Sequence, residues 1–211
     1  PHGLAIGKNH ITVSTCGIAP KINDYAMHPQ HGLLAISLHA PDDTTRSRLM
    51  PINRRYPVTE LMNTARENSC KIHIPSGAVL GLDNIKVGQI AKVDKILLRT
   101  TKSPASLKRE ISERTQLFGG KAGDCVREFP KNTNVAESLS LAVGKDIDVE
   151  LWADPAEDRN MHEIFFEGEF GEIYARIRNV PSPDNPATSY LAALSILSLL
   201  RNLDSPLVIG A

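Results

Sequence analysis

The chain has 211 residues, of which 41% are hydrophobic and 23% are charged, an ordinary balance for a globular protein. Its 24 basic and 24 acidic residues give a formal net charge of +0, which disfavours RNA or DNA as a partner. Three widely spaced cysteines without a CxxC pair predict no metal or iron–sulfur site, and no apolar run could span a bilayer, so we expect a cytoplasmic protein with no membrane partner.

Residues 1–64 alternate apolar runs with helix candidates. HITVSTCGI and GLLAISLHA are nearly continuous apolar runs, the pattern of parallel strands covered on both faces. APKINDYAMH, PDDTTRSRLM and PVTELMNTAREN predict helices, the second beginning at Pro41 and two aspartates. This order predicts an α/β fold, a βαβα parallel fragment resembling part of a barrel.

The elements expected in residues 65–211 are of a different kind. CKIHIPSG reads as a strand, and DIDVELWAD, NMHEIFFEGEF and GEIYARIRNVP alternate with period two, with EGEFGE supplying a hairpin turn. NTNVAESLSLAVG predicts a helix that ends at Gly144. NPATSYLAALSILSLLRNL predicts a helix with Pro186 in its first turn and a broad apolar face, so we expect it to be buried. The pattern predicts an α+β domain with a mixed or antiparallel open sheet covered by helices.

His162 allows two interpretations. Histidine is the side chain best suited to proton transfer near neutral pH, and Asp154, Glu157, Asp158 or Glu163 could orient it. The alternative is a partly exposed loop histidine at the entrance to a strand. From the residues alone the second interpretation is favoured, because a catalytic role needs partners that a sequence cannot place.

Three further segments could bind a ligand. In PSGAVLGLD, Gly77 and Ala78 would allow close approach to the backbone ahead of a helix, although an ordinary tight turn explains them equally well. Asn134 could cap the helix that it begins or could hydrogen-bond a carboxamide or carboxylate. RTTKSP could form a carboxylate clamp or simply a solvated strand end. The clamp residues are Arg99, Thr100, Thr101 and Lys102.

From about Ala65 to Ala211 the sequence resembles the catalytic domain of the L-aspartate dehydrogenase family. The resemblance rests on KIHIPSGAVLGLD, LLRTTKSP, FPKNTNVAESLSLA, WADPAEDRNMHEIFFEGEFGE and RNVPSPDNPATSYLAALSILSLLRNL. It implies NAD- or NADP-dependent oxidation of L-aspartate to iminoaspartate, which serves NAD biosynthesis. It further implies His162 as the active-site acid/base, cofactor contacts at Ala78 and Asn134, and a homodimer formed through the sheet.

Residues 1 to about 60 resemble the central part of the radical S-adenosylmethionine enzymes that methylate adenine in 23S ribosomal RNA. GLAIGKNHITVSTCGIAPKI, LLAISLHAPDD and RSRLMPINRRYPVTELM carry this resemblance. It implies S-adenosylmethionine contacts at Ser14, Ser37, Leu38 and His39. The cluster motif CxxxCxxC is not found, so no iron–sulfur cluster is expected.

Together the two resemblances predict a composite, with a methyltransferase-like fragment over residues 1–64 and a dehydrogenase-like domain over residues 65–211. In such a composite the fragment replaces the Rossmann domain that would hold the dinucleotide, which predicts weak cofactor binding and impaired activity. Two alternatives remain: a fragment of the methyltransferase, or a catalytically inactive domain that dimerises through its sheet.

Overall fold

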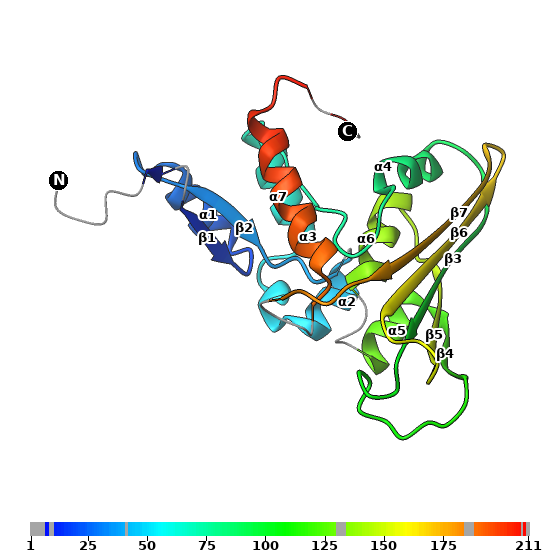
Figure 1. Cartoon of the computed structure of the whole chain (residues 1–211). Helices are drawn as coiled ribbons and strands as arrows, with labels where there is room; N and C mark the ends of the chain where they lie inside the picture. Colours follow the sequence, from blue (N-terminus) through cyan, green and yellow to red (C-terminus); the bar gives the residue numbers. More distant parts are fainter. Residues whose placement is uncertain are drawn as a thin grey trace. The chain divides into compact units, whose positions relative to one another are not determined.

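The computed structural model describes residues 7–8, 11–40, 42–129, 134–183, 188–207 and 209 (Figure 1). The chain divides into two compact units, Pro1–Ile72 and His73–Ala211. Helix α3 (Val58–Glu67) runs without a break through position 64, where the sequence pattern placed the boundary, so the first unit ends beyond that point.

The N-terminal unit has a parallel pair of strands, β1 and β2, as the pattern predicted, with Thr12 opposite Leu33 and Thr15 opposite Ile36. The expected burial of both strand faces is not found, because a pair of strands cannot be enclosed as a wide sheet can. Val13 and Leu33 remain exposed. The elements before α3 are β1 (Thr12–Thr15), α1 (Ala19–Ala26), β2 (Leu33–Ile36), α2 (Asp43–Leu49) and the 3₁₀ turn η2 (Pro51–Arg54).

A buried arginine ties this unit together. Arg46 of α2 is fully buried, and its Nη2 donates to the backbone oxygens of Cys16 at 2.6 Å and Ser37 at 3.3 Å. Its Nε donates to the oxygen of Leu38 at 2.8 Å, and Nη1 donates to Oδ1 of Asn53 at 2.6 Å. The guanidinium thus satisfies carbonyl groups just beyond both strands, where its planar fork of donors suits several acceptors at once.

The C-terminal unit contains a mixed sheet with the strand order β4-β5-β3-β6-β7 among the described residues. Strands β3 and β5 are parallel, and every other neighbouring pair is antiparallel. The strand expected in CKIHIPSG does not form, since residues 70–76 have no regular secondary structure. The elements are α4 (Leu82–Ile85), the 3₁₀ turn η3 (Lys86–Gln89), β3 (Val93–Lys102), β4 (Thr115–Lys121), α5 (Ala122–Glu128), α6 (Asn134–Val143), β5 (Asp148–Ala153), β6 (Asn160–Gly168), β7 (Gly171–Asn179) and α7 (Tyr190–Asp204).

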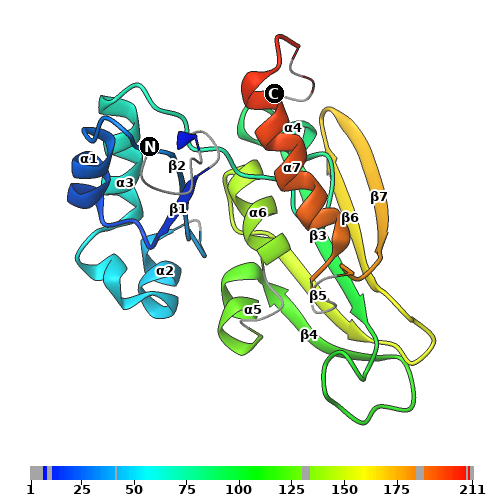
Figure 2. The ribbon, with the colours of Figure 1, turned by 60° about the vertical axis from the view of Figure 1, so that its left-hand side comes forward.

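The core lies between one face of this sheet and the helices, and we call this side the helix face (Figure 2). Leu98 and Phe166 from the strands pack there with Leu139 of α6 and Ile85 of α4. Side chains alternate between the two faces of a strand, so the residues between these point to the other side, the open face.

Helix α7 departs from the expectation of burial. Leu191 packs against the core, but Leu194, Leu197 and Leu203 have exposed fractions of 42%, 54% and 44%. The helix begins at Tyr190 after Ser189, and Pro186 lies outside the described residues. A helix that is apolar on most sides requires burial, but one sheet can cover only one side of it.

Candidate active site

His162 lies within β6 on the helix face and is only 5% exposed. It stands opposite Thr100 of β3 and Ile177 of β7 in the antiparallel register. Its Nδ1 atom lies 2.9 Å from Oγ1 of Thr100, a hydrogen-bonding distance. The interpretation as a partly exposed loop histidine is therefore wrong, because β6 begins at Asn160 and the imidazole is buried on the helix face.

The surroundings of His162 keep its ring neutral. Burial and, to a smaller extent, the positive charge of Lys102 lower the pKa of His162 from 6.5 to about 4. Lys102 follows Thr100 by two residues on β3, which puts both on the same face, and burial lowers the pKa of its ammonium group as well. At neutral pH one nitrogen of the imidazole consequently keeps a lone pair, as a proton acceptor must.

The turn that carries Ala78 is attached to the same end of the sheet. The backbone oxygen of Ala78 accepts a hydrogen bond from Nδ2 of Asn179 at 3.0 Å, and Oδ1 of that asparagine accepts one from Oγ of Ser189 at 2.7 Å. Asn179 ends β7, two residues beyond Ile177, which stands opposite His162. Ala78 and His162 thus belong to separate segments that meet at one end of the helix face.

Glycine gives this turn its shape and its open side. Gly77 has φ +66° and Gly81 has φ +73°, values that side chains rarely allow. A Cβ atom added at Gly77 would meet no atom within 4 Å, and its backbone N–H donates to Oγ of Ser195 in α7 at 3.1 Å. The turn is therefore anchored on one side and has room for a ligand beside the backbone.

Asn134 is the exposed first residue of α6, and its backbone oxygen accepts a hydrogen bond from Oγ of Ser138 at 2.9 Å. Lys131, Asn132 and Thr133, which precede it, lie outside the described residues. No hydrogen bond or ion pair joins Asn134 to His162 in the described part of the chain, so its link to the site rests on the resemblance.

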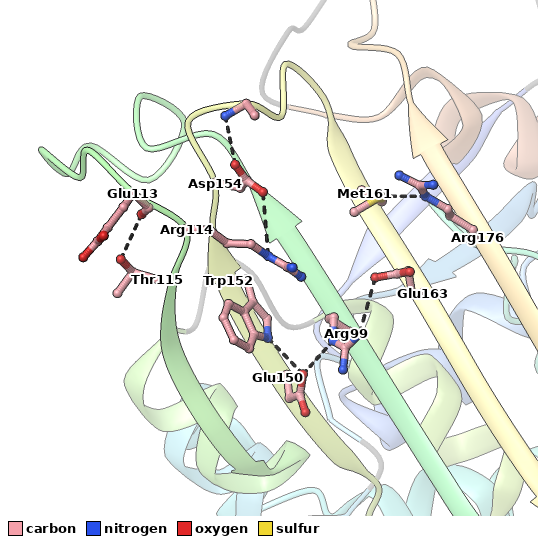
Figure 3. A network of polar contacts seen from close by, with 11 residues as sticks. Arg99, Glu113, Arg114, Thr115, Glu150, Trp152, Asp154, Met161, Glu163 and Arg176 are labelled. Carbon is pink, nitrogen blue, oxygen red and sulfur yellow. Dashed lines mark hydrogen bonds and ion pairs between the residues drawn. The ribbon is translucent and has the colours of Figure 1, made fainter.

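The four residues expected to form a carboxylate clamp are divided between the two faces of β3. Thr100 and Lys102 belong to the helix face, whereas Arg99 and Thr101 belong to the open face. Nε of Arg99 donates to Oε2 of Glu150 at 2.7 Å (Figure 3), and Oγ1 of Thr101 is buried without a hydrogen-bond partner. A single clamp of all four is therefore wrong, because neighbouring strand residues point in opposite directions.

The open face carries a polar network that the sequence analysis did not identify (Figure 3). Glu150 accepts from Arg99 and also from Nε1 of Trp152 at 2.9 Å, while Nη1 of Arg99 lies 3.9 Å from Oε2 of Glu163. Oη of Tyr174 donates to Oε1 of Glu163 at 2.6 Å. The alternation of β5 could have indicated that Glu150 and Trp152 share a face, but the parallel register that brings them to β3 is not visible in the sequence.

The residues matched to S-adenosylmethionine contacts lie in the N-terminal unit. Ser37, Leu38 and His39 follow the carboxyl end of β2, and His39 has φ +62°. The carbonyl groups of Ser37 and Leu38 accept hydrogen bonds from the buried arginine of α2, while Ser14 lies within β1 opposite Ala35. The carbonyls are thus used within the fold.

Comparison with known proteins identifies relatives for both units. Residues 83–203 match the family model described as aspartate dehydrogenase, C-terminal. L-aspartate dehydrogenase of Methanospirillum hungatei is 56% identical over 193 residues, which cover 92% of this chain and 71% of that protein. L-aspartate dehydrogenase of Methanothermobacter thermautotrophicus is 43% identical, covering 71% of this chain and 58% of that protein. The crystal structure of aspartate dehydrogenase from Thermotoga maritima superposes with a TM-score of 0.66 at 27% identity, covering 100% of this chain and 83% of that one.

The extent of these matches bears on the expected composite. A match over 92% of the chain must include most of the N-terminal unit, which is Pro1–Ile72. The comparisons therefore provide no support for assigning that unit to another family. Among the described residues, no group of three or more histidine, cysteine, aspartate or glutamate side chains could hold a metal ion, and no helix is long and apolar enough to cross a membrane.

Proposed function

The chain belongs to the aspartate dehydrogenase family, and on that premise we propose that it catalyses NAD- or NADP-dependent oxidation of L-aspartate to iminoaspartate. The observation that carries the proposal is the buried histidine on the helix face, whose lowered pKa leaves it neutral and able to take a proton. Most of this chain aligns with relatives named L-aspartate dehydrogenase.

In this proposal each residue has a distinct part. His162 accepts a proton from the substrate amine or from the hydrolytic water at the nitrogen that Thr100 leaves free. Lys102, on the same face as Thr100, provides positive charge for a substrate carboxylate, replacing the four-residue clamp. The nicotinamide group would supply the hydride acceptor.

Cofactor contact is proposed at Ala78 and Asn134. The open space beside Gly77 lets a ligand approach the backbone, which supports the assignment of the neighbouring Ala78. Asn134 opens α6 with a side chain that can both donate and accept hydrogen bonds, as a carboxamide requires. The choice between NAD and NADP is left to experiment.

The direct test measures reduction of NAD and NADP by L-aspartate with the full chain. We expect His162→Asn to abolish turnover, and activity within about tenfold of the unchanged protein would reject the acid/base role. His39→Asn is the matched control, because His39 lies in the other unit and also has φ +62°, which asparagine tolerates. Loss of dehydrogenase activity in that control alone would reject the assignment of the reaction to the C-terminal unit.

The strength of dinucleotide binding is a separate proposal. We propose that the chain binds NAD and NADP weakly, because the phosphate-binding turn of a Rossmann domain contributes most of that affinity and residues 1–64 carry no GxGxxG motif. Calorimetric titration of both cofactors tests this. Micromolar affinity would reject weak binding and leave the assignment of the reaction intact.

We also propose that the chain dimerises through the open face. The rings of Phe165 and Tyr174 lie 5.0 Å apart there, and Tyr174 is 57% exposed, while the polar network holds the neighbouring side chains in place. Sedimentation of the full chain should show a dimer that Tyr174→Asp weakens and that Glu128→Gln, at an exposed position of α5 away from the open face, does not. An unchanged monomer in all three would reject the interface, and a dimer without turnover would favour a purely structural role.

A further inference from the structure

The hydrogen bond between Thr100 and His162 joins two buried residues of neighbouring strands. Both residues are buried, with exposed fractions of 3% and 5%, and Oγ1 lies 2.9 Å from Nδ1. Their backbones face each other in the antiparallel register of β3 and β6, so the ladder itself holds the two side chains together. Threonine also has restricted rotation about χ1, which limits where its hydroxyl can point.

This contact determines which nitrogen can meet a substrate. With Nδ1 engaged by the hydroxyl, Nε2 is the ring nitrogen that remains for proton transfer. A neutral imidazole carries its single proton on one nitrogen only. Nε2 can accept a proton only in the form that carries hydrogen on Nδ1, and in that form the hydroxyl oxygen of Thr100 accepts the Nδ1–H bond.

The same bond then serves both protonation states. When Nε2 takes a proton, the ring becomes an imidazolium whose Nδ1–H still donates to Oγ1, so no partner has to move. Without the hydroxyl, a buried N–H of a charged ring would have no acceptor, which costs more than losing a bond between neutral groups.

We propose that Thr100 is the positioning residue for His162: its hydroxyl accepts the Nδ1–H bond and thereby holds the lone pair on Nε2, toward the substrate. This inference rests on the proposed function, in which His162 accepts a proton. Thr100 itself touches no reacting atom and acts through the imidazole.

Nitrogen-15 NMR of the full chain, labelled at histidine, reads the position of the ring proton without any turnover. The signals of His162 are identified by their loss in His162→Gln. We expect a protonated Nδ1 and an unprotonated Nε2 at pH 7. A proton found on Nε2 would overturn the proposal in the unchanged protein, whether or not any variant folds.

Substitutions of Thr100 test whether its hydroxyl determines the position of the ring proton of His162. Thr100→Val should shift the signals toward a mixture of the two forms and lower kcat about tenfold or more with little change in KM, whereas Thr100→Ser should keep the original form and most of the rate. Thr101→Val is the matched control, because Thr101 is equally buried on the adjacent position but its Oγ1 has no partner. Original signals in Thr100→Val, or an equal shift in Thr101→Val, would overturn the proposal.

The two ideas fail in different ways. If His162→Asn keeps its activity while the ring proton sits on Nδ1 in the unchanged protein, the proposed function fails and the positioning by Thr100 stands as a structural fact. If turnover depends on His162 but its proton sits on Nε2, the positioning fails alone.

Discussion

The burial of a neutral histidine makes the stability of the C-terminal unit depend on pH. The pKa of His162 is about 4 in the folded chain against 6.5 for an ordinary histidine. Between these two values the unfolded chain takes up a proton that the folded chain does not, so acid favours unfolding. The stabilisation is complete above pH 6.5, is lost as the pH falls from 6.5 to about 4, and changes no further below that range.

The size of the effect follows from the gap between the two pKa values. A gap from 6.5 to about 4 corresponds to about 3 kcal/mol of unfolding free energy across the whole window. Between pH 7 and pH 5, where most of the protein should remain folded, the expected loss is roughly 2 kcal/mol. That is a large part of the 5–15 kcal/mol that stabilises a typical domain.

Urea unfolding followed by tryptophan fluorescence measures this change in the stability of the C-terminal unit. The chain has one tryptophan, Trp152, and it lies in β5 of the C-terminal unit. Burial raises the pKa of Glu150, but hydrogen bonds from Arg99 and Trp152 outweigh it and hold that pKa below its usual 4.5. That carboxyl therefore titrates below most of the window.

His162→Gln supplies the comparison, because glutamine does not titrate but can still hydrogen-bond Thr100. The unchanged protein should lose roughly 2 kcal/mol more than this variant between pH 7 and pH 5. Equal losses in the two proteins would refute the reasoning, since the slope would then come from other groups.

Three further changes test neighbouring parts of the structure. Lys102→Met removes the positive charge that lowers the pKa of His162, so that pKa should rise in an NMR titration, and a fall would contradict the assignment. Asn179→Ala leaves the partly buried carbonyl of Ala78 without its donor, and we expect about 1 kcal/mol less stability and faster hydrogen exchange in that turn; unchanged exchange would contradict this. Arg46→Met should expose the N-terminal unit to thermolysin while the tryptophan unfolding curve stays unchanged, and a shift of that curve would show coupling between the units.

Local patterns predicted the elements whose causes are local. The alternation around EGEFGE gave a hairpin, and β6 pairs with β7 with Gly168 opposite Gly171. The helix that ends at Gly144 does so because this glycine adopts φ +76°, the left-handed conformation that a helix end often needs. In both cases the residues that determine the structure lie within a few positions of one another.

The pairing of strands that lie far apart in the sequence could not be predicted. The parallel pairing of β3 with β5 brings Arg99 beside Glu150, and no feature of either segment specifies the other. His162 and Thr100 likewise meet only because β3 and β6 align in one register. From the residues alone, His162 was more easily a loop histidine, and only the resemblance made it a catalytic candidate. Asn179 is a polar residue among the inward positions of β7, and this exception to the apolar pattern could have indicated the candidate site.

Two surfaces of the C-terminal unit, the open face and helix α7, have no covering element among the described residues. They differ in the free energy that exposure to water costs. On the open face Arg99 pairs with Glu150 and Glu163, and its guanidinium lies 5.2 Å from the ring centre of Phe165, so this part of the sheet tolerates solvent. Helix α7 has no such compensation, since Leu194, Leu197 and Leu203 leave 42%, 54% and 44% of their surface exposed to solvent. Each buried leucine contributes about 1.5–3 kcal/mol, so the apolar pattern of α7 favours burial of the helix. Among its leucines, Leu191 is the one that packs against the core of its own sheet. A hydrophobic pattern therefore predicts that a helix needs a partner surface, and only a tertiary structure can show whether the same unit supplies it.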